Sequence, residues 1–525
     1  MFIRKKTFYR QDGTKREYLQ IVETRREKDK VRQKVICNLG RLEDLRKGSI
    51  DTLTRGLAKF SEKLTVIDAG KDILAKDAKQ YGAPLVFRKL FGLVGLEDIL
   101  EEYLASHNHS FPVKEAVFAM ILNRILSPSS KLRVWEWLDE VYDPNLEGID
   151  LQHLYRALDF VAEHKEEIEK SLFQKVRNLF NLKLDVVFFD TTSIYFEGEG
   201  PENLATRGFS RDHHPDANQI VIGVLMSSEG IPIGCEVFCG NFQDMRTLKV
   251  ALNTLSSRFK IGKVILVADR GMVSEKNLSL IKDEGYEYIV GMKMRKLKKV
   301  RDHILSTPGR YKKLENNLKV KEVGLDNVRY IICYNPQEAE RDKKIREKII
   351  QNLEEKIRTG SLLRVLTGDA RKFCKVETKG VTLNKEKIKK EARYDGKYVL
   401  QTTTSLPSDE IVGAYKRLWM IEHAFRDIKN IFKIRPVFHW TPQRVKGHIF
   451  ICFLAFLLTT SLQKKLLEKG VKENVWKVIR DVKRVKAITL YVKDQAYLLR
   501  TDLKGLAYEA FRAVSLRVPS QVQKL

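Results

Sequence analysis

Hydrophobic and polar positions divide the chain into segments with different periods. In the first forty residues apolar positions alternate with basic ones, and the Asp12-Gly13 pair between them is typical of a hairpin turn. From about residue 50 to 180 apolar residues recur every three or four positions, most clearly in EAVFAMILNRIL and LRVWEWLDEVY. The pattern predicts a small antiparallel β region at 1–45 and a helical region at 46–180.

Between 184 and 292 short apolar runs replace the helical period. Three strand-like runs come first, LDVVFFD, QIVIGVLM and IPIGCEVF, and a helical stretch, DMRTLKVALNTLSSRF, follows them. Strand and helix then alternate through KVILVAD, SEKNLSLIKDEG and YEYIVGM. Two hairpin-compatible links followed by crossovers predict a mixed sheet, antiparallel first and parallel afterwards. This order is found in ribonuclease-H-like domains, so we expect an α/β fold whose first part is 181–292.

The stretch 293–396 differs from its surroundings and is predicted to be an α+β insertion. Basic clusters, KMRKLKKVR and NKEKIKKEAR, flank its strand-like pieces. The strand-like GKYVLQTTTS then resumes the α/β domain, which we expect to continue through 397–470, and SDEIVGAYKRLWMIEHAFRDIKN is predicted to be one long helix. The remaining residues, 471–525, are a candidate region for dimerisation.

Composition adds a prediction about partners. Lys and Arg number 96 and Asp and Glu 68, which gives a net charge of +28. So large an excess favours a polyanionic partner, and nucleic acid in particular, over a merely solvated basic surface. Six scattered cysteines without a CxxC pair indicate reduced thiols, and no signal peptide is recognised, so we expect a cytoplasmic protein. The most apolar run, IFICFLAFLL, is shorter than the ~20 residues of a membrane span and predicts a buried helix.

Two acids close strongly apolar strands: Asp190 ends LDVVFFD and Asp269 ends KVILVAD. Either alone is typical of an Asx turn or a helix N-cap. If the two strands are parallel neighbours, however, the carboxylates meet at one edge of the sheet and need a cation between them. Two Mg²⁺ (or Mn²⁺) ions fit this requirement, because hard cations prefer oxygen ligands and an ion pair can hold both reacting oxygens of a phosphate.

A third acid stands in the helix YKRLWMIEHAFRDIKN. Tyr415, Glu422 and Lys429 are spaced by seven residues and therefore fall along one line, beside the apolar stripe, with Arg426 one turn after Glu422. Packing the stripe on the sheet would direct Glu422 toward the sheet edge. We expect Glu422 to complete the metal site, and Tyr415, Arg426 and Lys429 to contact phosphates.

These motifs together resemble the DDE transposases of bacterial insertion sequences, in the insertion-sequence-four group with its Tyr, Arg, Glu, Lys helix. The resemblance covers roughly 184–292 and 395–450 and includes FFDTTSIYFEGEG, GFSRDHHPDANQIVIGVL, VADRGM and RPVFHW. It implies that Asp190, Asp269 and Glu422 are the metal-binding triad. The signature arginine falls three residues after the tyrosine, where this chain has Leu418, so either Arg417 or Arg426 takes its role or it is absent.

The resemblance implies a cytoplasmic, nucleoid-associated enzyme that works on double-stranded DNA as a synaptic homodimer. It would bind the terminal repeats of its element through 46–180, cut the ends, and join the freed 3′ hydroxyls to target DNA. Two other functions stay open: a DNA-binding protein of transposase descent without catalysis, and a ribonuclease-H-like nuclease. Tyr415 as a nucleophile is disfavoured, because its neighbours lack the Arg, His, Arg set of tyrosine recombinases. His213 and His214 more plausibly belong to a polar loop, and Asp244 to a helix N-cap.

Overall fold

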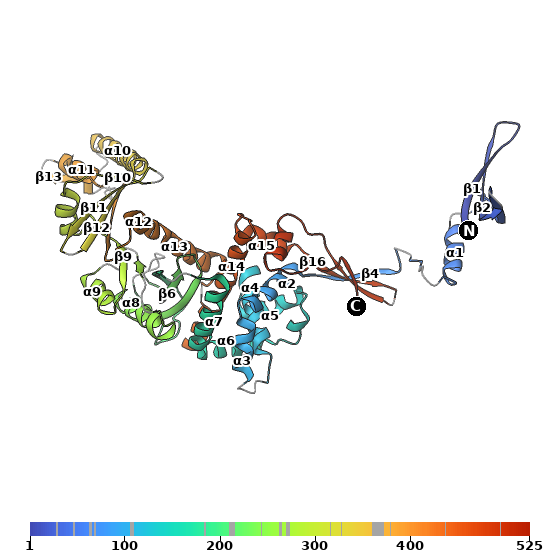
Figure 1. The fold of residues 1–525 in the computed structure, drawn as a ribbon, viewed down its shortest axis with the longest axis horizontal. Coiled ribbons are helices and arrows are strands. Elements are labelled where there is room, and N and C mark those ends of the chain that lie inside the picture. The colour runs from blue at the N-terminus through green and yellow to red at the C-terminus, as the bar shows by residue number, and fades with distance from the viewer. Residues whose placement is uncertain are drawn as a thin grey trace. The chain divides into compact units, whose positions relative to one another are not determined.

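The computed structural model has a mixed α/β architecture (Figure 1). It describes the chain from 1 to 525 except 28–29, 46–47, 62–65, 68–69, 106–109, 183–184, 209–215, 243, 262–264, 269–273, 315–316, 327, 360–371, 378–379, 436 and 494. Two compact units are formed, one by 1–77, 488–499 and 522–525, the other by 78–487 and 500–521.

The N-terminal unit contains the three antiparallel strands that the alternating pattern predicts. They are β1 (Phe2–Tyr9), β2 (Lys15–Glu27) and β3 (Lys30–Arg41), in the order β1-β2-β3. Tyr9 pairs with Lys15 across the first turn, where Gly13 has a φ of 79° and the Asp12 carboxylate accepts a 2.9 Å hydrogen bond from the Thr14 amide. This local bonding explains why Asp-Gly is a turn signal. Helix α1 (Ser49–Ala58) follows and buries no side chain.

A further sheet has the order β18-β17-β16-β4. Its strands are far apart in the sequence: β4 (Ile73–Gln80), β16 (Lys486–Val492), β17 (Gln495–Arg500) and β18 (Val522–Lys524).

Helices dominate the residues that precede the central sheet. They are α2 (Gly82–Leu93), α3 (Leu96–Ala105), α4 (Val113–Leu126), α5 (Lys131–Trp137), α6 (Leu151–Glu163) and α7 (Lys165–Phe180). Near the C-terminus α15 (Val475–Lys483) and α16 (Ala507–Ala513) join them.

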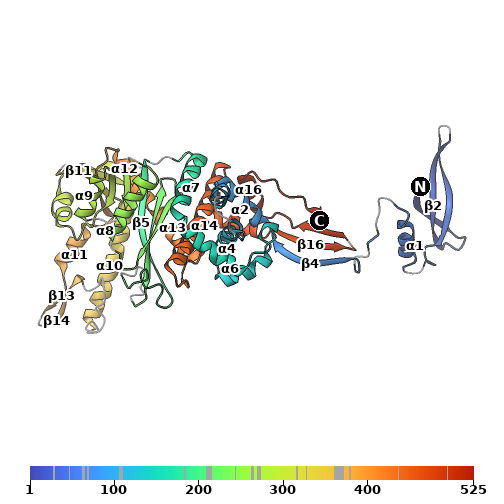
Figure 2. The same ribbon diagram turned by 90° about the horizontal axis from the view of Figure 1, so that it is seen from below.

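Helix α14 (Pro442–Glu468) is the core helix of this unit and contacts α2, α4 and α6 (Figure 2). It is the one helix among the described residues that is long and apolar enough to cross a membrane. Its apolar window is 89% buried inside the protein, however, which agrees with the predicted buried helix. The full helix is longer than the apolar run on which the prediction depended.

Nine strands form the central sheet, in the order β10-β11-β12-β15-β9-β8-β5-β6-β7. The first five along the chain are β5 (Val186–Tyr195), β6 (Gln219–Ser227), β7 (Pro232–Cys239), β8 (Ile265–Ala268) and β9 (Glu287–Gly291). Strand β5 is antiparallel to β6 and β6 to β7, whereas β8 is parallel to both β5 and β9. The predicted order and direction of these five strands are therefore confirmed.

The stretch 293–396 extends this same sheet and adds a small subdomain. Its strands β10 (Lys312–Lys313), β11 (Lys319–Leu325) and β12 (Val328–Tyr334) lead to β15 (Lys397–Thr402), which pairs antiparallel with β9. The other elements are α10 (Pro336–Arg358), α11 (Lys385–Ala392) and the β13 (Cys374–Glu377) and β14 (Gly380–Leu383) hairpin. Of α10 only Leu353 is buried, as expected for a charged, solvated helix.

Helices cover both faces of the central sheet (Figure 1). On one face α8 (Asp244–Asn253) and α9 (Glu275–Asp283) pack through Leu248, Leu252, Leu278 and Ile281 onto Val187, Phe189 and Leu266. On the other, α12 (Ser408–Arg417), α13 (Trp419–Arg426) and α14 pack against residues of the opposite parity, such as Phe188 and Val267. This alternation is the two-residue period of a strand buried on both faces.

The long helix predicted for 408–430 is interrupted. Helix α12 ends at Arg417, α13 begins at Trp419, and a π-helix occupies Asp427–Ile431. At the break the amide of Leu418 bonds to the carbonyl of Tyr415, and that of Ile421 to Leu418, which are tighter i to i+3 bonds. The prediction of one continuous helix was therefore wrong, because a continuous apolar stripe does not reveal a change of helical pitch.

Candidate active site

Asp190 lies in the middle of β5 rather than at its end, so the sequence prediction of a strand-closing acid was wrong. The strand continues to Tyr195, paired throughout with β6, because TTSIY extends the β-branched and aromatic run beyond the acid. The residue is 9% exposed, and its Oδ1 accepts a 2.7 Å hydrogen bond from the Thr191 amide. By strand alternation Asp190 shares the face of Phe188 and Ile194, against which α12 to α14 pack.

Asp269 lies outside the described residues, directly after the last residue of β8, Ala268. The parallel register aligns Phe188 of β5 with Val267 of β8. Asp190 and Asp269 are each two residues further along their chains than this pair. The structure confirms that β5 and β8 are parallel neighbours, which was the premise of the sequence argument, although Asp190 lies within β5 and does not follow it.

Glu422 lies on α13, which contacts β5. The helix is anchored by the buried side chains of Leu418, Ile421 and Phe425, three positions of the stripe recognised in the sequence. Glu422 is next to this stripe and exposed. A carboxylate on the margin of a packed face is held in place without the cost of burying an unpaired charge. Asp190 and Glu422 thus come from a strand and a helix that pack together on one face of the sheet.

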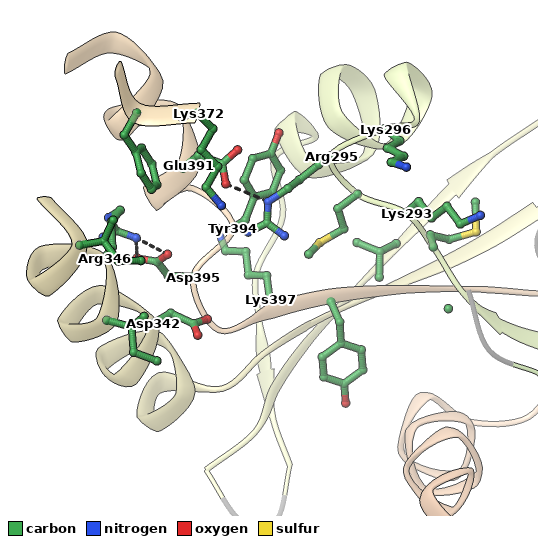
Figure 3. A pocket seen from close by; sticks show the side chains of 18 of the residues that line it. Lys293, Arg295, Lys296, Asp342, Arg346, Lys372, Glu391, Tyr394, Asp395 and Lys397 are labelled. Atoms are coloured by element: carbon green, nitrogen blue, oxygen red, sulfur yellow. Dashed lines mark hydrogen bonds and ion pairs between the residues drawn. The ribbon is translucent and has the colours of Figure 1, made fainter. Parts of the chain in front are cut away.

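A cavity of about 820 Å³ opens beside Glu422 and Tyr415. It is bounded by the end of β9, by α10 and α11, by β15 and by α12 and α13. Its charged lining consists of six bases and four acids: Lys293, Arg295, Lys296, Arg346, Lys372, Lys397, Asp342, Glu391, Asp395 and Glu422. Figure 3 shows most of these side chains around one hollow. Positive charge therefore predominates.

Three of the four cavity acids are already engaged. Arg295 donates to Glu391 at 2.8 Å, Arg346 pairs with Asp395 (Figure 3), and Asp342 accepts a 2.9 Å bond from the Gly396 amide. Lys397 donates to the Arg393 carbonyl, and burial together with Lys321 and Arg393 lowers its pKa. No described acid forms an ion pair with Lys293, which is half-buried and lies two residues after β9. The cavity can therefore attract an anionic ligand.

Tyr415 lies against the end of β9. A Cβ added to Gly291 would lie 2.1 Å from the Tyr415 hydroxyl oxygen, so only glycine leaves room for the phenol. The ring also stacks on Tyr398, with centroids 6.1 Å apart at 23°. Tyr415 is consequently both a packing residue and a cavity residue, and its predicted phosphate contact stays a prediction.

Arg426 and Lys429 are not among the described residues that line this cavity. Arg426 is exposed at the end of α13, and Lys429 is half-buried in the π-helix, whose wider turn shifts it relative to Glu422. Arg417 is exposed at the end of α12, whereas Leu418 is buried. The predicted roles of these arginines and of Lys429 in DNA contact stay predictions.

Hard divalent cations fit the chemistry of the three acids, which offer only carboxylate oxygens. Among the described residues, which exclude Asp269, no group of three or more His, Cys, Asp or Glu side chains could hold a metal ion. The predicted metal site, which includes Asp269, stays a prediction. The six cysteines, all in the described part of the chain, form no disulfide.

Sequence reasoning missed the basic lining of the cavity. The cluster KMRKLKKVR was recognised only as the flank of an insertion, yet its residues Lys293, Arg295 and Lys296 line the same cavity as Glu422. Its position directly after the apolar run YEYIVGM was the available signal, because residues after a parallel strand lie at the edge where ligands bind.

Two family models match the chain. The model of the transposase DDE domain matches residues 181–458, just over half of the chain, and includes the positions of all three predicted acids. The model of the N-terminal domain of IS1634 family transposases matches residues 3–70. No curated protein matches the chain.

Solved structures with some likeness are also transposases. A piggyBac transposase synaptic complex with hairpin DNA has a TM-score of 0.38 at 9% identity, covering 76% of this chain and 79% of its own. A Mos1 transposase paired-end complex has a TM-score of 0.15 at 11% identity, covering 35% and 60% respectively.

Proposed function

The chain belongs to the family of DDE transposases, and from this premise we propose that it binds the terminal repeats of its own insertion sequence, cuts the ends and joins the 3′ hydroxyls to target DNA. The observation that carries the proposal is the packing of α13 on β5, since it brings Glu422 and Asp190 to one face of the sheet. Two acids from distant segments on one side of a sheet are what a shared phosphoryl-transfer site requires.

We assign Asp190, Asp269 and Glu422 as the ligands of two Mg²⁺ (or Mn²⁺) ions. When bound, the ions supply Lewis-acid stabilisation of the charge that develops on the phosphate oxygens. The chain itself positions the reactants: β5 fixes Asp190 within a paired, buried strand, and the apolar stripe of α13 fixes Glu422. Both acids are therefore on rigid elements, which favours a precise in-line geometry for attack by water and then by a 3′ hydroxyl.

The cavity beside Glu422 is proposed to hold DNA phosphates close to the reacting bond. Lys293, which forms no ion pair with a described acid, and the exposed Lys296 would neutralise phosphate charge, and the whole-chain charge of +28 would draw DNA to the protein. Tyr415, Arg426 and Lys429 are assigned as further phosphate contacts, the role that the signature helix of the insertion-sequence-four group implies.

The biological setting of the reaction is also a proposal. Joining two element ends to one target requires that both ends be held together, so we propose a synaptic homodimer on double-stranded DNA. The cytoplasm, at the nucleoid, is the compartment where such DNA and free thiols coexist.

A cleavage and joining assay tests this function. The full-length protein would be incubated with labelled element ends, a target plasmid and Mg²⁺. We expect ends cut by the wild-type protein and joined to the plasmid, and no cutting by Asp190→Asn, Asp269→Asn or Glu422→Gln, each of which should still bind the ends. Cutting without joining would support a nuclease instead, and binding without cutting in the wild type would support a DNA-binding protein that has lost catalysis.

A further inference from the structure

A second, smaller cavity, of about 390 Å³, is lined by positive charge and aromatic rings. It gathers residues that the carboxylate site does not use: 128–131, between α4 and α5, and 435 with 438–440, before α14. We call it the Lys131 pocket. Its charged lining includes Arg124, Lys131, Arg435 and Arg444.

Lys131 is the most unusual side chain of this pocket. It is only 3% exposed, and its ammonium forms no hydrogen bond or ion pair with any described residue. The charged group that influences the pKa of Lys131 most is another buried cation, Arg124, which is 5% exposed. Burial, and secondarily Arg124, lowers the pKa of Lys131 to about 7. The described lining of the pocket contains two buried cations and no carboxylate, an arrangement that favours binding of an external anion.

Arg124 is bound but not neutralised. Its guanidinium donates to three main-chain carbonyls, those of Ser129, Phe432 and Lys433, whereas its buried Nε has no partner. These carbonyls fix the side chain at the pocket without cancelling its charge. Arg444 is partly compensated, because it forms a bidentate pair with Asp159. Arg124 and Lys131 therefore carry buried charge that no described carboxylate compensates, whereas the pocket's Lys433 is exposed.

Aromatic side chains form the rim of the Lys131 pocket. Trp440 is 69% exposed and Phe438 62% exposed, although both belong to a segment anchored by the buried Val437. Large exposed rings beside a buried cationic site are a feature of surfaces that stack nucleobases. The 27-residue α14 begins at this pocket, and Thr441 and Arg444 belong to the pocket lining. The N-terminus of the helix adds a partial positive charge.

The pocket is connected to Asp190 through β5. Tyr195 ends that strand and contacts Arg435, whose guanidinium lies 5.7 Å from the ring centroid, and the next residue, Phe196, pairs with Val437. Five residues of strand separate Asp190 from Tyr195, about 17 Å at 3.3 Å per residue. One strand of a DNA duplex covers that distance in about five nucleotides.

We propose that the Lys131 pocket binds a backbone phosphate of a DNA strand, with the attached nucleoside against Trp440. The proposal rests on the proposed function insofar as DNA is the substrate. It adds an anchor beyond the end of β5, built by Arg124 and Lys131 and separate from the three acids. Such an anchor would fix the register of the strand, while the acids act on one bond.

The test measures DNA binding in a protein that cannot cut. Fluorescence anisotropy with labelled element ends would compare Asp190→Asn with the double variants that add Lys131→Met or Trp440→Ala. We expect Lys131→Met to raise Kd by about tenfold to one hundredfold and to lower the salt slope by about 0.9, the value for one phosphate contact. Trp440→Ala should raise Kd by about fivefold or more, the effect of losing one stacked base.

A matched control is Lys472→Met, an exposed lysine in the loop after the far end of α14, about 40 Å away along the helix. It should leave Kd within about twofold. An unchanged Kd in Lys131→Met, with the melting temperature retained, would overturn the proposal. The proposal would also be overturned if the wild-type pocket bound free inorganic phosphate but DNA binding did not depend on Lys131. Cleavage by the wild-type protein is measured separately, so that loss of the proposed function and loss of this anchor are distinguishable.

Discussion

Replacing Lys131 by Met should stabilise the folded protein at neutral pH. Met has nearly the volume of Lys but carries no charge, so the substitution keeps the packing of α5 while removing a buried, unpaired cation. Most substitutions of buried residues destabilise. A gain in stability would therefore identify Lys131 as a residue that the fold tolerates at a cost, which is expected at a binding site.

The magnitude follows from the pKa of Lys131, which falls from 10.5 to about 7 on folding, chiefly through burial. Between pH 7 and pH 10.5 the unfolded chain binds more protons than the folded one. Lys131 therefore lowers the free energy of unfolding, by an amount that increases as the pH falls from 10.5 and reaches its full value below 7. At pH 7 the cost is about 4 kcal/mol, and at pH 10 it is about 1 kcal/mol. Both free-energy costs are upper bounds, because the protein relaxes around the charge.

Urea unfolding of the wild type and Lys131→Met at pH 7 and pH 10, in buffer without phosphate or sulfate, measures this difference. We expect a gain of about 2 kcal/mol or more at pH 7 that shrinks at pH 10. In a thermal melt, for a unit of about 430 residues, 4 kcal/mol corresponds to about 4 °C. Lys472→Met should change stability by less than about 0.5 kcal/mol. A loss of stability at pH 7, or a gain independent of pH, would refute the reasoning.

Two further predictions concern the carboxylate site. Gly291→Ala should lower the free energy of unfolding by about 1 to 3 kcal/mol and displace Tyr415, because the new methyl would lie 2.1 Å from the Tyr415 hydroxyl oxygen. Gly324→Ala is the control, because the space around Gly324 is open, and it should have little effect in the same urea titration. Equal effects of the two substitutions would argue against that contact. Lys429→Ala should weaken binding of element ends and reduce the salt slope by about 0.9 in anisotropy titrations; an unchanged slope would exclude a phosphate contact.

The central strands were predictable from the sequence because their signal is local. Runs such as LDVVFFD and KVILVAD are apolar at every position, as strands buried on both faces must be, and the hairpin and crossover links between the runs determine the order. The anchoring stripe of α13 was predictable for the same reason, since Leu418, Ile421 and Phe425 are buried as their spacing indicates.

Features that depend on tertiary contacts were not predictable. The break at Leu418 and the π-helix at Asp427–Ile431 leave the hydrophobic period intact, so no pattern reveals them. Likewise β5 passes Asp190 because its partner β6 is long enough to pair with it to Tyr195. The Lys131 pocket joins residues more than 300 positions apart, as in the bond from Arg124 to the Phe432 carbonyl. In the sequence alone, a lysine that becomes buried cannot be distinguished from an ordinary surface lysine.

Convergence of the three acids on shared metal ions is tested most directly by metal-directed cleavage of the polypeptide. Fe²⁺ would replace Mg²⁺ in the wild-type protein bound to element ends, and peroxide with ascorbate would generate radicals that cut the chain close to the ion. The account predicts backbone cuts near Asp190, Asp269 and Glu422, all suppressed by excess Mg²⁺ and by Asp190→Asn. Cuts near one or two of these residues but not the third, in the presence of DNA, would contradict it.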